Sequence, residues 1–214
     1  MNLKNIGFYF ITDSILTKKG VMDDVKEALD AGVKIVQYRE KKKSTREMLY
    51  ECRALRDLCR GRALFMVNDR IDIALAANAD GVHLGQEDMP YPEARLLMGG
   101  EKIIGLTVHN EKEAIDAEKS GADYVGASPV FETRTKSDAG KQAGLQLVRN
   151  IKRKVEIPVV AIGGINLENV LRVMDAGADS VCAISAVIGK GLTGKECKKF
   201  VDIINSCCRK RITS

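Results

Sequence analysis

The sequence predicts an α/β fold, and within that class a single-domain (β/α)8 TIM barrel. Short apolar runs of strand character alternate eight times with longer segments of helical spacing along the 214 residues. Strands that alternate with helical patterns favour βα units around a parallel sheet, and eight such units in a chain of this length match the lower size range of the barrel. No linker or change of composition divides the chain, so residues 1–214 are expected to form one domain, with 207–214 as a solvated basic tail.

A doubly wound open sheet is the alternative architecture. It would need a longer crossover at its switch point, and eight regular βα units leave little room for one. A weak internal repeat supports the barrel, because glycine recurs in three helix-to-strand turns, at residues 31–33, 120–123 and 176–179. The glycine in each turn fits the left-handed position that commonly ends a helix.

The individual elements follow from local signals. Apolar runs between turn signals indicate the strands, which are expected in chain order at residues 7–12, 33–39, 63–67, 79–84, 103–108, 123–127, 158–162 and 180–184. Helical spacing and end signals indicate the helices; Ser44 with Glu47, for example, forms a capping box. The helices are expected in chain order at residues 22–30, 44–61, 70–77, 91–98, 111–120, 145–154, 167–176 and 194–205.

Composition and charge exclude several classes of function. Hydrophobic residues make up 45% and charged residues 29%, which is typical of a soluble protein. No apolar run is long enough to span a bilayer and the N-terminus lacks the layout of a signal peptide, so we expect a cytoplasmic protein without a membrane partner. The net charge of +5 is mild and no basic block is interleaved with aromatics, so no nucleic-acid partner is expected.

The six cysteines are scattered without metal-ligand spacing, and we expect them to be free thiols. The sequence does not define the oligomeric state, and a homo-oligomer is compatible with it.

Two carboxylates follow neighbouring strands of the expected barrel. Asp69 comes just after strand 63–67, and Asp88 lies shortly after strand 79–84. Because catalytic groups of such barrels come from the carboxyl ends of strands, the two side chains would face one another, and like charges that close need a cation, a shared proton or a basic partner. One or two carboxylates completed by substrate phosphates is a set of ligands that Mg²⁺ uses. Taken singly, each aspartate could instead cap the helix that follows it.

A cationic anion-binding site is predicted after strand 33–39. Gln37, Arg39 and Lys41 alternate and so project from one face of an extended segment. Arg39 and Lys41 together would clamp an anion, arginine by paired hydrogen bonds and lysine as a point charge. The alternative is a solvated basic strand end.

Two further segments suit phosphate. Residues 128–142 form the longest loop, and its Thr133, Arg134, Thr135 and Lys136 offer hydroxyls and cations for phosphate binding or a mobile lid, with disorder as the alternative. Gly163 and Gly164 follow strand 158–162, where backbone N–H groups can approach a phosphate closely, and the turn at Ile184 and Ser185 would supply the other half of that site.

The histidines suggest no nucleophilic catalysis. His83 is expected to be a packed core residue, and His109 stands at a strand end and could lie on the rim. No serine–histidine or cysteine–histidine arrangement is evident. Metal-assisted departure of a diphosphate is therefore the simplest chemistry that these residues allow.

The sequence resembles the thiamine phosphate synthases over nearly the whole chain. The resemblance is carried by residues 37–41, 68–70 with 81–88, 105–109, 129–136 and 162–165. It implies a transferase that joins a hydroxymethylpyrimidine diphosphate to a thiazole phosphate, or its carboxylated precursor, and releases diphosphate. It also implies a dissociative reaction, in which diphosphate leaves first and the thiazole nitrogen traps a pyrimidine-methyl cation.

The resemblance also implies roles for single residues. Asp69 and Asp88 would bind Mg²⁺. The pyrimidine diphosphate would contact Gln37, Tyr38, Arg39, Glu40, Lys41, Asn68, Thr107 and Lys136. The thiazole phosphate would contact Thr133, Arg134, Thr135, Gly164, Ile184 and Ser185. Arg39, Lys41 and Lys136 would be the catalytic residues, because they would stabilise charge that grows on the leaving diphosphate.

Three departures from the family pattern keep alternatives open. Thr107 replaces the usual serine, Glu132 stands where proline is frequent, and residues 127–128 replace a pair that usually contains glycine. Residues 131–133 are similar to those of the thiazole tautomerases, so a metal-free isomerase is one alternative, and a non-catalytic barrel that binds a phosphate ligand is another. Retention of Arg39, Lys41 and both aspartates favours the synthase.

Overall fold

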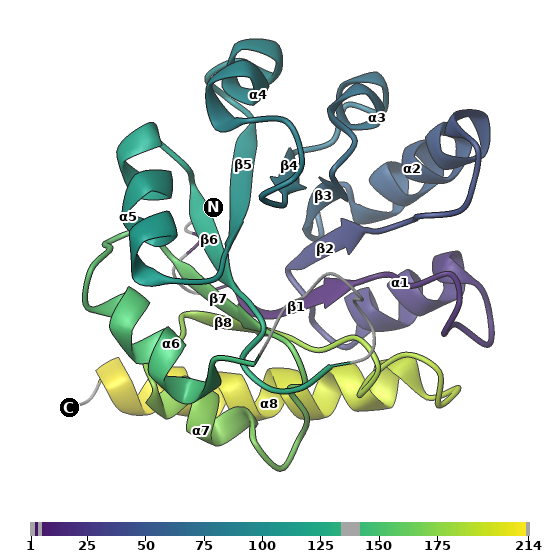
Figure 1. Cartoon of the computed structure of the whole chain (residues 1–214). Helices are drawn as coiled ribbons and strands as arrows, with labels where there is room; N and C mark the ends of the chain where they lie inside the picture. The colour runs from purple at the N-terminus through teal and green to yellow at the C-terminus, as the bar shows by residue number, and fades with distance from the viewer. Residues whose placement is uncertain (1–2, 4–5, 134–141, 213–214) are drawn as a thin grey trace.

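The computed structural model describes residue 3, residues 6–133 and residues 142–212. Within them, eight parallel strands close into a barrel in chain order, and helices surround it (Figure 1). The first strand pairs with both the second and the eighth, so the sheet has no open edge. The predicted (β/α)8 barrel is therefore confirmed, and the doubly wound open sheet is wrong.

The bounds of the elements match the expected ones closely. The strands are β1 (Gly7–Ile11), β2 (Ile35–Tyr38), β3 (Leu64–Asn68), β4 (Gly81–Leu84), β5 (Ile103–Val108), β6 (Tyr124–Ala127), β7 (Val159–Ile162) and β8 (Ser180–Cys182). The helices are α1 (Val21–Asp30), α2 (Thr45–Cys59), α3 (Ile71–Ala76), α4 (Tyr91–Met98), α5 (Glu111–Ser120), α6 (Gly144–Lys152), α7 (Val170–Asp175) and α8 (Thr193–Ile212).

Two helix ends differ from the prediction by more than two residues. Helix α7 begins at Val170 rather than at residue 167, because the Asn166 side chain accepts the backbone N–H groups of Glu168 and Asn169 and holds a turn there. Helix α8 continues to Ile212, past the expected end at residue 205. The backbone of residues 207–212 is therefore helical, and the solvation of this basic end stays a prediction.

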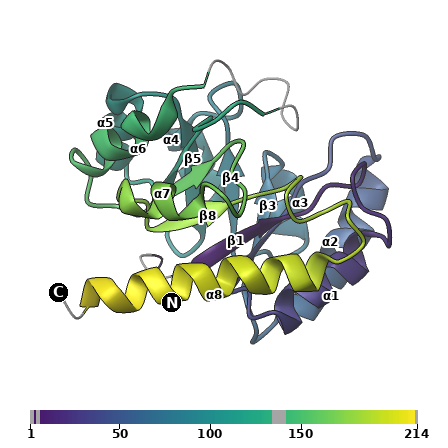
Figure 2. The same ribbon diagram turned by 90° about the horizontal axis from the view of Figure 1, so that it is seen from below.

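Strand alternation divides the apolar residues between two cores. Inward side chains such as Tyr9, Met66 and Tyr124 fill the barrel, and outward ones pack beneath the helices. Helix α8 lies along β1 and α1 (Figure 2), where the rings of Phe8 and Phe200 stack with centroids 4.8 Å apart. These two layers hold the strand ends that form the site.

One glycine makes room for a large side chain inside the barrel. A β-carbon at Gly105 on β5 would overlap the ring and hydroxyl of Tyr124, which is fully buried. Glycine at this position therefore lets a tyrosine of β6 occupy the centre of the barrel, where it matters for the site.

The described helices include none that is both long and apolar enough to cross a membrane. Cys52, Cys59, Cys182, Cys197 and Cys207 are free thiols, as expected.

Candidate active site

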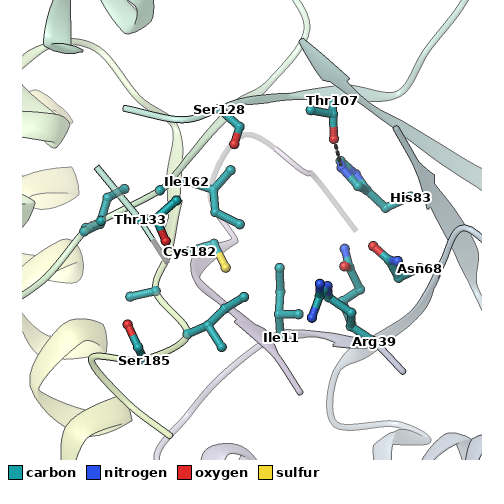
Figure 3. Close-up of a pocket in the computed structure, with 16 residues that line it drawn as sticks. Ile11, Arg39, Asn68, His83, Thr107, Ser128, Thr133, Ile162, Cys182 and Ser185 are labelled. Atoms are coloured by element: carbon teal, nitrogen blue, oxygen red, sulfur yellow. Dashed lines mark hydrogen bonds between the residues drawn. The ribbon is translucent and has the colours of Figure 1, made fainter. Parts of the chain in front are cut away.

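A cavity opens at the carboxyl end of the barrel, and every strand, or the one or two residues after it, contributes to its wall. In chain order these contributions are Ile11, Gln37 and Arg39, Asn68, His83, Thr107, Ser128, Ile162, and Cys182. Figure 3 shows Arg39, Asn68, His83 and Thr107 on one side and Thr133 and Ser185 on the other, with Ile11, Ile162 and Cys182 between. The cavity thus has two polar sides separated by an apolar wall.

The structure brings together many of the residues predicted for the two phosphate sites. The predicted site residues that line the cavity are Gln37, Arg39, Asn68, Thr107, Thr133, Gly164, Ile184 and Ser185. Arg134, Thr135 and Lys136 lie outside the residues that the structure describes. The other predicted residues do not line this cavity; they are Tyr38, Glu40, Lys41, Asp69 and Asp88.

Asp69 and Asp88 meet beside the cavity, as expected from their places after β3 and β4. Their carboxyl groups are hydrogen-bonded to each other, and Lys41 Nζ lies 2.5 Å from Asp69 Oδ2. Burial raises the pKa of Asp69, but the hydrogen bonds from Lys41 and Asp88 outweigh it and hold the pKa below its ordinary value. Burial and then the neighbouring Asp69 raise the pKa of Asp88, so Asp88 is the first of the two carboxylates to take up a proton as the pH falls.

Neither aspartate caps a helix, so that alternative is wrong. Helices α3 and α4 lack a side-chain hydrogen bond at their N-caps, which are Arg70 and Pro90. Asp88 Oδ2 instead accepts the backbone N–H of Gly85 at 2.6 Å. Asp69 has a left-handed backbone (φ 61°), which is uncommon for a residue with a side chain and is often found at functional sites.

The environment of this pair fits a divalent cation. Both donors are carboxylates, and Lys41 compensates the charge of Asp69. Among the described residues no group of three or more histidine, cysteine or carboxylate side chains converges. A cation held here would complete its shell with water or ligand oxygens, which is the usual situation of Mg²⁺.

Arg39 reaches into the cavity from the end of β2. Its Nη1 lies 3.4 Å from Asp13 Oδ2, and its backbone N–H donates to Thr12 Oγ1 at 2.9 Å. Asp13 itself is held by the backbone N–H groups of Ile15 and Leu16. Sequence reasoning did not select Asp13 as a site residue, although the polar end of β1 was the signal that could have found it.

Tyr38 and Glu40 do not line the cavity. Tyr38 is buried beneath α2, and its hydroxyl donates to Glu51 Oε2 at 2.7 Å. Glu40 Oε1 accepts the backbone N–H groups of Lys41, Lys42 and Lys43 at 2.8, 2.7 and 3.3 Å. Glu40 thereby shapes the loop that presents Lys41 to Asp69.

The pKa of Glu40 is lowered in this setting. Burial raises it, but the hydrogen bonds from Ser14 and from the three backbone N–H groups outweigh that effect.

The glycine pair after β7 joins two loops. Gly163 and Gly164 both have positive φ, and a β-carbon at Gly164 would overlap Phe131 and the carbonyl of Glu132. Phe131 N–H donates to the Gly163 carbonyl at 3.0 Å. The absence of side chains thus lets the segment that carries Thr133 pack directly on the turn after β7.

His83 faces the cavity, so its expected place in the packed core is wrong. Side chains alternate between the two faces of a strand, and position 83 is on the same inward face of β4 as Gly81. His83 Nε2 lies 2.9 Å from Thr107 Oγ1, and Nδ1 lies 2.9 Å from the Tyr124 hydroxyl. His109 lies partly exposed after β5, with Nδ1 2.6 Å from the carbonyl oxygen of Ser128.

Comparisons with known proteins agree on one family. A family model described as thiamine monophosphate synthase matches residues 8–187. A thiamine-phosphate synthase of Methanosarcina mazei is 57% identical over 202 residues, which are 94% of this chain and 84% of that protein. A thiamine-phosphate synthase of Methanosarcina barkeri is 54% identical over 202 residues, which are 94% of this chain and 92% of that protein. The solved thiamine phosphate pyrophosphorylase from Pyrococcus furiosus superposes with a TM-score of 0.89 at 44% identity, over 96% of this chain and 99% of that one.

Proposed function

Since the chain belongs to the thiamine monophosphate synthase family, we propose that its cavity joins a hydroxymethylpyrimidine diphosphate to a thiazole phosphate and releases diphosphate. The family makes the chain a thiamine-phosphate synthase, a transferase of thiamine biosynthesis that acts on small molecules. The observation that carries the proposed chemistry is the meeting of Asp69, Asp88 and Lys41 beside a cavity lined by Arg39. A metal-free isomerase would have no use for that acid pair.

The pyrimidine diphosphate would occupy the side of the cavity formed by β2 to β5. Gln37, Asn68 and Thr107 offer hydrogen bonds to the ring, and Arg39 and Lys41 offer positive charge to the diphosphate. Lys136, which lies outside the described residues, would add a third cation. Tyr38 and Glu40 would support this side indirectly, through α2 and through the loop of Lys41.

Asp69 and Asp88 would hold Mg²⁺, with diphosphate oxygens among its remaining ligands. When bound, Mg²⁺ would supply Lewis-acid neutralisation of charge on the diphosphate. In the protein itself, Lys41 already balances the charge of Asp69, and this lets the carboxylates of Asp69 and Asp88 lie close together before substrate binds.

The thiazole phosphate would bind on the opposite side. Thr133, Gly164 and Ser185 offer hydroxyl and backbone donors for its phosphate beside Ile184. Arg134 and Thr135 are proposed for the same phosphate from outside the described residues. This side carries fewer charges than the other among the described residues, which suits a monophosphate better than a diphosphate.

The reaction that fits these two sides is dissociative. The bond from the pyrimidine methylene carbon to the diphosphate oxygen breaks, its electrons leave with diphosphate, and Arg39, Lys41 and Lys136 stabilise the growing negative charge. The lone pair of the thiazole nitrogen then forms the new carbon–nitrogen bond, so no general base is required. Ile11, Ile162 and Cys182 line the wall between the two sides and would exclude water that could otherwise capture the cation.

An activity assay tests the proposal. Purified protein with both substrates and Mg²⁺ should form thiamine phosphate and diphosphate in equal amounts, and excess chelator should abolish the reaction. Asp69→Ala and Asp88→Ala should each lower kcat roughly 10²-fold or more. Asp116→Ala, an exposed carboxylate on α5, is the matched control and should keep full activity.

Three results would contradict the proposal. Turnover of a thiazole phosphate alone without metal would indicate the isomerase. Ligand binding without turnover, unchanged by Asp69→Ala, would indicate a non-catalytic barrel. Full synthase activity in excess chelator would exclude the role of Asp69 and Asp88.

A further inference from the structure

A continuous chain of hydrogen bonds crosses the inside of the barrel from Gln37 to Thr107. Gln37 Nε2 donates to the Tyr9 hydroxyl, the Tyr9 and Tyr124 hydroxyls are joined, Tyr124 meets His83 Nδ1, and His83 Nε2 meets Thr107 Oγ1. Each of the four contacts is 2.9 Å long. The chain takes one residue from each of β2, β1, β6, β4 and β5, and both of its ends line the cavity.

The two tyrosines at the centre of this chain are sealed from solvent. Tyr9 and Tyr124 are among the largest fully buried side chains of the described protein, and Gly105 leaves the space that the Tyr124 ring fills. Burial raises the pKa of both phenols, so both keep their protons. Each phenol therefore donates one hydrogen bond within the chain and accepts another.

The single proton on each phenol gives the chain a direction. Gln37 donates to Tyr9, so Tyr9 must donate to Tyr124, and Tyr124 must then donate to His83 Nδ1. His83 consequently carries its proton on Nε2 and donates it to Thr107. The opposite sense is also self-consistent, but it requires the Gln37 amide and every proton in the chain to reverse together. With a neutral His83 ring, any mixed arrangement leaves one contact with two protons or with none.

We infer that Tyr9 and Tyr124 are positioning residues that fix the tautomer of His83 and force Gln37 and Thr107 to present opposite hydrogen-bonding polarity to the ligand. In this sense of the chain, Thr107 offers its hydroxyl proton, and Gln37 offers its amide oxygen beside its second N–H. An aminopyrimidine matches this pair, because it has an amino donor beside a ring-nitrogen acceptor. The corresponding oxo-pyrimidine presents the reverse pattern. This reading of the ligand rests on the proposed function, whereas the tautomer of His83 does not.

The tautomer can be measured directly, because the chain has two histidines. Protein labelled with ¹⁵N in the histidine rings is recorded in a long-range ¹H–¹⁵N spectrum at about pH 8, above the ordinary histidine pKa of about 6.5. His109 Nδ1 faces the Ser128 carbonyl, which accepts only, so its proton belongs on Nδ1. We expect opposite tautomers, with the proton on Nε2 in His83 and on Nδ1 in His109, and His109→Gln assigns the two signals.

Phenylalanine variants test whether the tyrosines impose this tautomer. Tyr124→Phe removes the donor to His83 Nδ1 and should give a mixture of tautomers. The double variant Tyr9→Phe with Tyr124→Phe removes both phenols, so it leaves neither one unpaired in the core if the single variant folds poorly. Tyr38→Phe is the matched control, since it deletes another buried phenol hydrogen bond on the opposite face of β2, and the His83 signal should not change.

Substrate discrimination tests the coupling of the two ends. Wild-type protein should use the aminopyrimidine diphosphate roughly 10²-fold better in kcat/KM than the oxo analogue, and the double variant should lose about tenfold of that preference. A wild-type His83 protonated on Nδ1, or a His83 signal unchanged in both variants, would overturn the tautomer assignment. An undiminished preference in the double variant would overturn the coupling. If the wild-type protein formed no thiamine phosphate while the spectra behaved as expected, the proposed function would fail and the assigned tautomer would stand.

Discussion

Glu40 offers a sharp test of how the Lys41 loop is held. Its carboxylate is buried and accepts three backbone N–H groups, two of them at 2.7 and 2.8 Å. A hydrogen bond to a charged group contributes about 1.5–3 kcal/mol, and burial of the carboxylate opposes the sum. Glu40→Ala should therefore lower the free energy of unfolding by about 2–4 kcal/mol, and Glu40→Gln, which keeps one acceptor oxygen, by about half as much.

The effect should also depend on pH in a defined direction. The pKa of Glu40 is lowered in the folded protein, so its contribution to stability is complete above the ordinary glutamate pKa of about 4.5 and is lost as the pH falls through the lowered folded value. Wild-type protein should lose stability through this acid window more steeply than Glu40→Ala. Chemical denaturation followed by circular dichroism, repeated from about pH 7 to about pH 3, measures both quantities.

A matched control separates this role from a general effect of charge. Glu101 is exposed and lies before β5, at the other end of the barrel from Lys41, so Glu101→Ala should change stability by no more than about 0.5 kcal/mol. Glu40→Ala should also raise KM for the pyrimidine diphosphate, because Lys41 loses its support. If Glu40→Ala is as stable as Glu101→Ala and keeps the wild-type KM, Glu40 does not organise the loop.

Three further outcomes follow from the packing and from the cavity. Gly105→Ala should destabilise the fold by about 1–3 kcal/mol in denaturant titrations because its β-carbon overlaps Tyr124, whereas Gly100→Ala, in open space, should be near neutral. Phe8→Ala should cost about 3–5 kcal/mol, and a double-mutant cycle with Phe200→Ala should show non-additivity from the stacked rings; strict additivity would contradict a direct contact. Asp13→Asn should raise KM for the pyrimidine diphosphate several-fold while kcat changes less, because Asp13 orients Arg39; steady-state kinetics with an unchanged KM would exclude that role.

The fold and the acid pair could be predicted because local signals determine them. Alternating strand and helix patterns define the eight units, and two aspartates after adjacent strands must come close if the sheet is parallel. The direction in which each side chain points was harder to predict from the sequence. His83 was misplaced because its neighbours Val82 and Leu84 are apolar, although alternation along β4 places it inward. The hydrogen bonds of Glu40 to the backbone of the Lys41 loop could not be predicted either, because nothing in the sequence indicates them.

The hydrogen-bond chain inside the barrel could not have been found in this way. Tyr9 and Tyr124 are 115 residues apart, and nothing near either of them in the sequence indicates the other. Their meeting depends on the closed barrel and on the space left by Gly105. Likewise, α8 packs against β1 and α1, which lie far from it in the sequence, and local propensity does not describe such contacts.

The pairing of β1 with β8 has a consequence for the synthesis of the chain. Strand β1 pairs with β8, and Ser180 Oγ donates to the Gly7 carbonyl at 2.6 Å, so the barrel strand that is synthesised before the other seven is completed by the one synthesised after them. Until about residue 182 has emerged, the nascent sheet has two unpaired edges, which are templates for aggregation. A chain truncated just before β8 should therefore need chaperone protection far more than the full-length protein does.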